Sequence, residues 1–158
     1  MKFKLIFCDP EKCVGCQMCE LACSLTKEKG INPRLSRIRL VRIEPFVMMP
    51  VSCRLCEDYP CVKSCPRNAL SVNFETGIVR VDEKKCNGCS WCINACPFGA
   101  INLNSDRRRV FICDMCEGEP RCVEFCPVDA LNYASHEEFL QQIRKKSIEK
   151  LLQELIKS

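Results

Sequence analysis

The sequence of 158 residues contains 17 cysteines, and 16 of them fall into four groups of four. In each group two to five residues separate the first three cysteines, and three residues separate the third from the fourth. Proline follows the fourth cysteine in groups two, three and four, whereas Ser24 follows it in group one. The groups are Cys13, Cys16, Cys19 and Cys23; Cys53, Cys56, Cys61 and Cys65; Cys86, Cys89, Cys92 and Cys96; and Cys113, Cys116, Cys122 and Cys126. Thiolates in such clusters are typical metal ligands.

The spacing within each group matches the ligands of a [4Fe–4S] cluster. Each iron corner of the cube needs one thiolate, and a tight loop can reach three corners with its first three cysteines. In two-cluster ferredoxins the fourth cysteine of the group ligates the other cluster. The four groups therefore predict four [4Fe–4S] clusters with all sixteen cysteines as iron ligands. Spacing alone leaves the pairing open, because group one can share its clusters with group two or with another group.

Two other uses of the cysteines fit the sequence less well. Zinc sites usually pair two C-x2-C knuckles roughly 12–20 residues apart, whereas here a third and a fourth cysteine follow at once. A disulfide scaffold needs an oxidising compartment, but the cysteine count is odd and the N-terminal residues show no secretory signal. We therefore expect a cytoplasmic iron–sulfur protein and keep a zinc-binding module as the remote alternative. Cys8, outside the groups, is expected to act as a buried apolar side chain.

Charge and hydropathy argue against other classes of protein. The 24 basic and 20 acidic residues give a formal net charge of +4. Each oxidised cluster with its four thiolates carries about −2, so four clusters bring the net charge to about −4. The basic excess thus compensates the clusters, and we expect no nucleic-acid partner. No apolar run approaches the roughly 20 residues of a membrane span. Without a nucleotide-binding loop or a histidine near a cysteine group, we expect electron relay and no catalysis.

Short strands and short helices are expected to position the cysteine loops. Apolar runs flanked by turns predict strands over residues 3–7, 38–43, 70–74, 78–81, 101–103 and 110–112. The last four strands form two hairpins. Helices or helical turns are expected around the third and fourth cysteines, over residues 19–29, 62–65, 93–96 and 123–126. Gly30 is expected to end the first helix.

The segment after the last cysteine group predicts a longer helix. Ser135 and Glu138 have the spacing of a capping box. Apolar residues then recur at helical spacing, with lysine and glutamate between them. Residues 135–158 are therefore expected to form an amphipathic helix, which either packs on the rest of the chain or docks on another subunit.

The residues resemble those of a known family, the four-cluster, ferredoxin-like electron-transfer subunits of multi-subunit redox enzymes. The resemblance covers residues 1–133 and rests on the four spacings together and on the proline missing after group one. It also rests on the motifs Cys86-Asn-Gly-Cys-Ser-Trp-Cys92 and Cys113-Asp-Met-Cys116. Members of this family are the small iron–sulfur partners of molybdenum and tungsten pterin oxidoreductases, formate dehydrogenases, carbon monoxide dehydrogenase and some hydrogenases.

The resemblance implies an α+β fold with two ferredoxin-like halves of two [4Fe–4S] clusters each, the second inserted in the first. The outer half comprises residues 1–50 and 105–134, the inner half residues 51–104, and the C-terminal amphipathic helix residues 135–158. Group one then shares its clusters with group four, and group two with group three. The implied ligand sets are Cys13, Cys16, Cys19 and Cys126; Cys113, Cys116, Cys122 and Cys23; Cys53, Cys56, Cys61 and Cys96; and Cys86, Cys89, Cys92 and Cys65.

The resemblance also implies a function, that of the iron–sulfur relay subunit of an oxidoreductase complex. Single electrons would pass through four clusters between a catalytic subunit and a ferredoxin or another electron-carrier subunit. A tungsten or molybdenum pterin oxidoreductase of the aldehyde type is expected as the catalytic partner, ahead of the other enzymes of the family, and an anaerobic source is expected. A free-standing soluble polyferredoxin is the alternative, because the cysteine spacings do not identify the partner.

Overall fold

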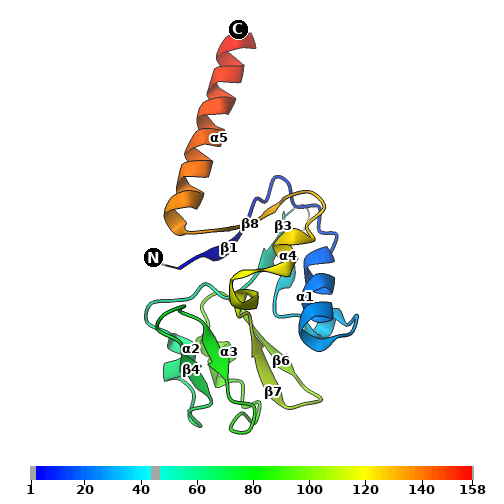
Figure 1. Cartoon of the computed structure of the whole chain (residues 1–158), viewed down its shortest axis with the longest axis vertical. Helices are drawn as coiled ribbons and strands as arrows, with labels where there is room; N and C mark the ends of the chain where they lie inside the picture. Colours follow the sequence, from blue (N-terminus) through cyan, green and yellow to red (C-terminus); the bar gives the residue numbers. More distant parts are fainter. Residues whose placement is uncertain (1–2, 44–46, 158) are drawn as a thin grey trace.

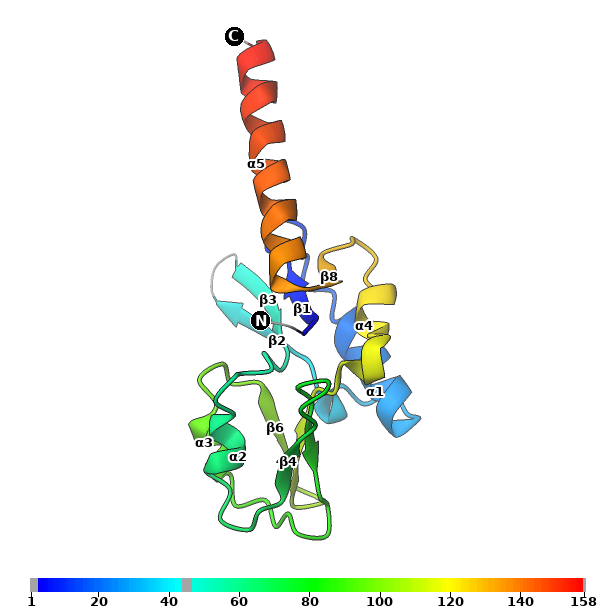
Figure 2. The ribbon, with the colours of Figure 1, turned by 60° about the vertical axis from the view of Figure 1, so that its left-hand side comes forward.

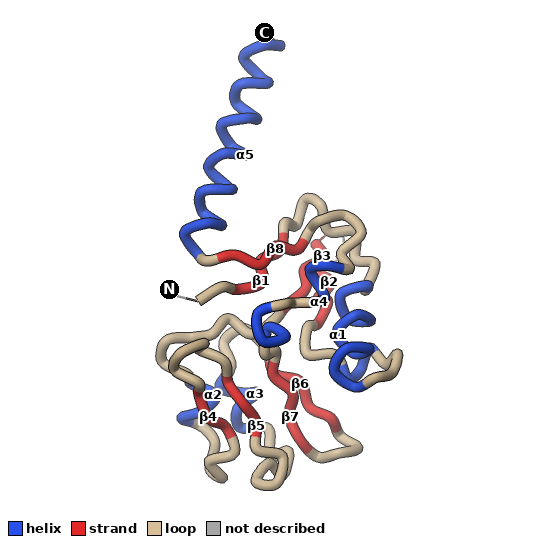
Figure 3. Tube along the Cα trace, viewed as in Figure 1, coloured by secondary structure: helices blue, strands red, loops and turns tan. Residues whose placement is uncertain are grey.

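The computed structural model describes residues 3–43 and 47–157. Residues 1–2, 44–46 and 158, which belong to the predicted outer half and the predicted C-terminal helix, lie outside the described residues. Figure 1 shows a body of short strands and short helices from which one long helix projects, with the C-terminus at its far end. Loops connect all of these elements and form a large part of the body (Figure 3). The chain is thus of mixed α and β structure, as predicted.

The strands of the described residues form four two-stranded antiparallel sheets. They are β1 (Leu5–Cys8), β2 (Arg39–Ile43), β3 (Val47–Val51), β4 (Leu70–Val72), β5 (Val79–Val81), β6 (Ile101–Asn104), β7 (Arg109–Ile112) and β8 (Leu131–Ala134). β2 pairs with β3, β4 with β5 and β6 with β7, so each link between consecutive cysteine groups contains a hairpin. β1 pairs with β8, which joins the two ends of the cysteine-rich region.

Each of the four helices of the body contains the third cysteine of one group. They are α1 (Met18–Glu28), α2 (Pro60–Lys63), α3 (Trp91–Ala95) and α4 (Arg121–Glu124), with 3-10 turns η1 (Pro33–Leu35) and η2 (Met115–Gly118). In Figures 1 and 2, α1 lies beside α4 although groups one and four are far apart in the sequence. α2 likewise lies beside α3. The helices therefore bring group one to group four, and group two to group three.

The structure confirms the predicted hairpins and helical turns and corrects two details. β3 was not predicted from the sequence, where Pro50 argues against a strand. Both strands of a two-stranded sheet are edge strands, so Pro50 is tolerated opposite Leu40. α1 ends at Glu28, and the left-handed residue that caps it is Lys29, with a φ of 54°, and not Gly30.

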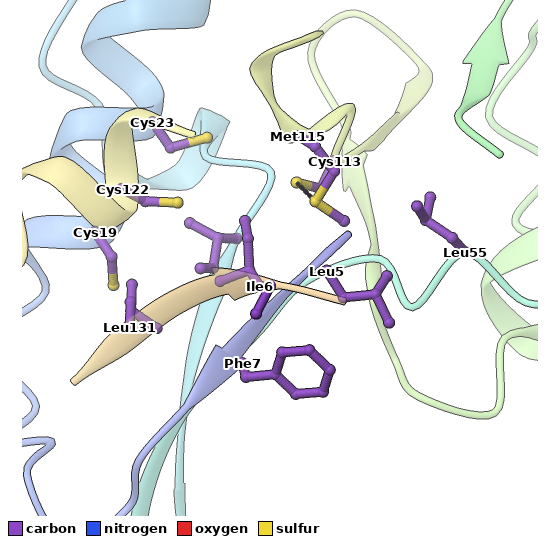
Figure 4. Close-up of a cluster of buried hydrophobic side chains, with 12 residues drawn as sticks. Leu5, Ile6, Phe7, Cys19, Cys23, Leu55, Cys113, Met115, Cys122 and Leu131 are labelled. Carbon is purple, nitrogen blue, oxygen red and sulfur yellow. Dashed lines mark hydrogen bonds between the residues drawn. The ribbon is translucent and has the colours of Figure 1, made fainter. Parts of the chain in front are cut away.

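The buried side chains form two cores, and cysteines contribute to both. The first core, drawn in Figure 4, contains Leu5, Ile6, Phe7, Ile38, Leu55, Met115, Leu131 and Ala134 with Cys19, Cys23, Cys113 and Cys122. The second contains Leu70, Val79, Ile101, Val110 and Ile112 with Cys92. Each core holds few large apolar side chains, and small domains with such cores are usually marginal without metals or disulfides.

The last helix, α5 (His136–Lys157), begins with the predicted capping box. The Ser135 backbone N–H donates to Glu138 Oε2 at 2.7 Å, and the Glu138 N–H donates to Ser135 Oγ at 3.2 Å. The predicted C-terminal helix is therefore confirmed over its described residues. Among the helices of the described residues, none combines the length and the apolar character that a membrane crossing requires.

The first turns of α5 rest on the body, and the rest of the helix extends away from it (Figures 1 and 2). The Phe139 ring stacks on the Phe7 ring with 3.9 Å between the ring centroids. Lys146 Nζ forms ion pairs with Asp9 Oδ2 at 2.8 Å and Glu11 Oε2 at 2.7 Å. Farther along, the apolar side chains are exposed, namely Ile148, Leu151, Leu152, Leu155 and Ile156.

Replacing Phe139 by alanine is expected to release α5 from the body without loss of iron. An aromatic pair contributes about 0.5–1.5 kcal/mol beyond its buried area. The Lys146 side chain is 41% exposed, so its ion pairs with Asp9 and Glu11 contribute less. Hydrogen exchange should show faster exchange of the α5 amides in Phe139→Ala. Leu151→Ala, whose side chain is 59% exposed, is the matched control and should leave exchange in the first turns unchanged. Equal exchange in the two variants would contradict the expected anchoring role.

Candidate metal centres

The first three cysteines of group one surround a cavity together with the fourth cysteine of group four. Cys13 and Cys16 lie on the loop before α1, Cys19 lies in the first turn of α1, and Cys126 follows α4. We call this set site I. Cys8, at the end of β1, lies half-buried beside Cys13, and burial raises the pKa of the Cys8 thiol to about 12.

Group three has the same arrangement with group two. Its first three cysteines and the fourth cysteine of group two line one further cavity, and we call them site IV: Cys65, Cys86, Cys89 and Cys92. α2 and α3 lie side by side at this site, so that Cys65, which follows α2, reaches the loop before α3. The fourth cysteine again lies with cysteines of a different group.

Two further sets of four cysteines lie between these sites. Site II contains Cys23, Cys113, Cys116 and Cys122, which lie close enough together for their charges to interact. Site III contains Cys53, Cys56, Cys61 and Cys96, which are related in the same way. In Figure 4 the sulfurs of Cys23 and Cys122 point toward Cys113, whereas the sulfur of Cys19, one helical turn before Cys23, points elsewhere. One helix, α1, therefore supplies cysteines to two sites.

The four sites lie in the order I, II, III, IV. Cys19 of site I lies near Cys122 of site II. Cys113 of site II lies near Cys53 of site III, and Cys53 packs against both cores. Cys92 of site IV lies near Cys61 of site III. Of the seventeen cysteines only two are exposed, and these belong to the end sites: Cys16 and Cys89.

Backbone N–H groups donate to the fourth cysteine of every group. In groups two, three and four the donor is the alanine four residues later, at 3.3, 3.4 and 3.3 Å: Ala69 to Cys65, Ala100 to Cys96 and Ala130 to Cys126. In group one no proline follows Cys23, and α1 continues to Glu28. The residue four positions after Cys23 is therefore part of the helix. Cys23 Sγ instead accepts from the Arg37 N–H at 3.3 Å. Such bonds stabilise thiolates and help to set cluster potentials.

Ser24, which stands in the place of the proline, positions the segment that carries Arg37. The Ser24 side chain is fully buried. Its hydroxyl donates to the Leu21 carbonyl at 3.0 Å and accepts from the Asn32 N–H at 3.3 Å. The hydroxyl thus ties the loop after α1 back onto the helix, and this loop leads to Arg37.

A group of charged side chains lies beside site II. Asp114, between Cys113 and Cys116, accepts from the Lys27 ammonium at 2.7 Å and from Arg37 Nη1 at 2.9 Å. Burial opposes ionisation of Asp114, but Lys27 and Arg37 outweigh it and lower the pKa of the carboxyl. Lys27, Arg37 and Asp114 were not predicted as site residues, because the cysteine spacing includes none of them and Arg37 lies 14 residues beyond Cys23.

Burial controls the protonation of the interior thiols. It raises the pKa of Cys19 and Cys113 to about 12 and that of Cys53 and Cys92 to about 11. These thiols are therefore protonated at neutral pH until a metal displaces the proton. In residues 3–43 and 47–157, no three His, Cys, Asp or Glu side chains have the geometry to hold a single metal ion. Four cysteine sulfurs around one cavity, with an N–H donor at the fourth, fit the larger [4Fe–4S] cube.

Gly88, between Cys86 and Cys89 of site IV, is expected to be intolerant of substitution. Its φ is +72°, and a Cβ there would lie 2.8 Å from the Arg108 carbonyl oxygen. Gly99 has a φ of +61° but open space around it. Both alanine variants should lose about 1–2 kcal/mol through the left-handed backbone. Gly88→Ala should lose roughly 1–3 kcal/mol more through overpacking, together with iron from site IV. Anaerobic denaturant titration and iron analysis measure this difference, and equal losses in the two variants would argue against it.

The fold and the sites together define an iron–sulfur protein of the ferredoxin class. The sequence pattern of the 4Fe-4S dicluster domain family matches residues 45–136, and that of a 4Fe-4S binding domain matches residues 10–26. The chain belongs to the 4Fe-4S dicluster family of electron-transfer subunits and binds multiple [4Fe–4S] clusters. It is an electron-transfer protein without a catalytic role of its own.

Two relatives of similar sequence agree with this class. The polyferredoxin-like subunit of aliphatic sulfonate oxidoreductase from Pyrococcus furiosus is 47% identical over 116 residues, covering 73% of this chain and 67% of the relative. The electron transport protein HydN from Escherichia coli is 34% identical over 139 residues, covering 72% of this chain and 75% of HydN. Among solved structures, the active site complex BamBC of benzoyl coenzyme A reductase with 1,5-dienoyl-CoA contains a chain with 28% identity and a TM-score of 0.49, and the match covers 83% of this chain and 75% of that one.

Proposed function

We propose that the chain relays single electrons through four [4Fe–4S] clusters, one at each of sites I to IV. One observation carries this proposal: at each site three cysteines of one group meet the fourth cysteine of another. A bound cluster accepts and donates one electron at a potential that its surroundings set. The chain supplies the thiolates, the N–H donors to the fourth cysteines and an interior with low exposure to water.

The proposed ligand sets divide the chain into two halves. Sites I and II use groups one and four, which belong to residues 1–50 and 105–134, and sites III and IV use groups two and three, within residues 51–104. The pairing of β1 with β8 supports an outer half that encloses an inner one. The hairpin of β6 and β7 crosses the boundary at residue 104, and Val110 and Ile112 pack in the second core. The division is thus proposed for the cluster ligands and not for every strand.

The order of the sites gives the relay two ends. Sites I and IV are the end sites, and each has one exposed cysteine, Cys16 or Cys89. Exposure at both ends is what a relay needs, because one end must exchange electrons with a catalytic subunit and the other with a carrier. We propose that electrons enter or leave at these two ends and that sites II and III connect them.

We propose a catalytic redox subunit as the partner. The relative from Pyrococcus furiosus is named as a subunit of an oxidoreductase, which supports a complex over a free-standing polyferredoxin. A tungsten or molybdenum pterin enzyme of the aldehyde type is the proposed catalytic subunit, with a ferredoxin or another carrier subunit at the opposite end. Native mass spectrometry of the anaerobic complex, with tungsten and molybdenum analysis, tests this. Purification as a lone chain in native extracts would favour the polyferredoxin.

Iron and acid-labile sulfide analysis tests the clusters themselves. Anaerobically purified protein should contain about sixteen iron atoms and about sixteen sulfides per chain. Stoichiometric zinc without sulfide would replace this proposal by a zinc-binding module. We also propose a cytoplasmic location, which the lack of disulfides among the seventeen cysteines supports, because disulfides are rare in reducing compartments.

A further inference from the structure

Site II differs from the other sites in the residue that donates to its fourth cysteine. At Cys65, Cys96 and Cys126 the donor is the N–H of an alanine, whose side chain carries no charge. At Cys23 the donor is the N–H of Arg37. The replacement of proline by Ser24 and the long loop after α1 thus place a cationic residue directly against one ligand of site II.

The charge of Arg37 is held in place beside this site. Arg37 Nη1 and Lys27 Nζ share Asp114 Oδ2 at 2.9 and 2.7 Å. Asp114 Oδ1 in turn accepts from the Cys116 N–H at 3.1 Å, within the loop that carries two ligands of the site. The three side chains are mostly buried, with 24%, 16% and 24% exposure for arginine, lysine and aspartate. Two cations and one carboxylate leave one net positive charge where water screens it poorly.

The Arg37 side chain also has a donor that the protein does not use. Arg37 Nε is buried and has no hydrogen-bond partner among the described residues. A buried donor without an acceptor destabilises a fold by about 1–3 kcal/mol. The ion pair with Asp114 therefore holds the Arg37 guanidinium in place although one of its donors stays unsatisfied.

The charged pair beside site I has no net charge. The buried charge next to its ligand Cys19 is the carboxylate of Glu20, which is 6% exposed. Glu20 Oε1 accepts from the Leu40 N–H at 3.0 Å, and Arg39 Nη1 lies 3.8 Å from it. This pair is neutral as a whole, whereas the charged group beside site II has a net positive charge, which favours the addition of an electron.

We propose that Arg37, fixed by Asp114 and assisted by Lys27, raises the reduction potential of the cluster at site II. This inference rests on the proposed function, because it requires a cluster with Cys23, Cys113, Cys116 and Cys122 as ligands. Reduction adds one negative charge to the cluster, so a fixed cation and N–H donors beside it stabilise the reduced form. Arg37 is thus a tuning residue of the relay, which makes site II the more favourable position for an electron arriving from site I.

Anaerobic redox titrations of the holo-protein followed by electron paramagnetic resonance test this inference. Arg37→Gln should move one of the cluster signals to lower potential and leave the others in place. Asp114→Asn should move the same signal to higher potential, because it removes the negative charge between two cations. Arg37→Lys should restore most of the potential. Since the charges are mostly buried, these shifts should persist at high salt.

Arg121→Gln is the matched control. Arg121 precedes the ligand Cys122 of the same site, but it is 46% exposed and pairs with Glu124 at the surface. Its loss should move the site II signal less than Arg37→Gln does. Unchanged potentials in Arg37→Gln and Asp114→Asn, or shifts in the same direction, would overturn the inference. If Arg37→Gln loses iron, two other variants test the inference. Lys27→Gln should lower the reduction potential of the site II cluster, and Asp114→Asn should raise it. A wild-type iron content far below about sixteen would instead refute the proposed clusters.

Discussion

Removal of iron and sulfide is expected to unfold the cysteine-rich body. The loss should amount to the whole stability of a small domain, about 5–15 kcal/mol, because the clusters replace a conventional core. Each sheet of the described residues has only two strands, and an isolated two-stranded hairpin is marginally stable at best in water. The two cores contain cysteines among few large apolar side chains. Metal ligation therefore supplies folding free energy that the side chains lack.

Acid should promote this loss. The interior thiols, such as Cys113 with a pKa raised to about 12 by burial, bind protons tightly when no metal is present. Cluster binding requires these thiols as thiolates, so protons compete with iron and the competition strengthens as the pH falls. Iron release, followed by loss of the cluster absorbance, should therefore become faster below neutral pH.

Circular dichroism of the iron-free protein measures the unfolding. We expect a weak spectrum and no cooperative thermal transition, with reconstitution by iron and sulfide restoring both. The residual helical signal should come from α5, whose described residues contain no cysteine. Phe139→Ala serves as a holo control that loosens α5 while the body stays folded. A native-like, cooperative melt of the iron-free chain would contradict the structural role of the clusters.

The arrangement of the elements follows from the cysteine repeat to a large extent. Leu70–Val72 and Val79–Val81, like the strands around Ser105 to Arg108, are apolar runs on either side of a turn, and they fold as hairpins. The capping box at Ser135 and Glu138 is equally local, and its hydrogen bonds are present. Predictions that depend on contacts within a few residues therefore succeeded.

Features that depend on distant contacts could not be predicted. The missed strand β3 is different, because its partner β2 is the preceding strand in the chain; β3 contains Pro50, and proline is rare in strands. The bond from the Arg37 N–H to Cys23 joins residues separated by a loop and a 3-10 turn. The direction of α5 depends on the contact of Phe139 with Phe7, more than 130 residues earlier in the chain. The sequence predicts the amphipathic helix itself but not how much of it the body covers.

The ligand pairing gives the second large expected effect. Removal of one fourth cysteine should release the three cysteines of a different group, because the fourth cysteine crosses to another cluster. Cys126→Ala should lower the iron content from about sixteen toward about twelve per chain. The cysteines released should be those that line the same cavity as Cys126, namely Cys13, Cys16 and Cys19.

Alkylation of free thiols under anaerobic conditions, followed by peptide mass spectrometry, identifies the released cysteines. Pairing of group one with group four predicts new labelling at Cys13, Cys16 and Cys19 in Cys126→Ala. In Cys65→Ala, pairing of group two with group three predicts it at Cys86, Cys89 and Cys92, which share a cavity with Cys65. Pairing of group one with two and of group three with four predicts the reverse. The new labelling would then lie in group three in Cys126→Ala and in group one in Cys65→Ala. The experiment therefore distinguishes the two topologies through the same six cysteines.

Cys8→Ala is the control for this series. Cys8 lies beside Cys13 but outside the four groups, so its removal should leave about sixteen iron atoms bound and no other cysteine newly labelled. A loss of iron in Cys8→Ala would make it a ligand in place of one of the sixteen. Labelling of group one in Cys65→Ala would instead show that group one shares its clusters with group two. The two halves would then follow each other in the chain, and α1 would have to lie beside α2. The contact of α1 with α4 in the structure favours the nested arrangement, because Cys23 and Cys122 then face the same site.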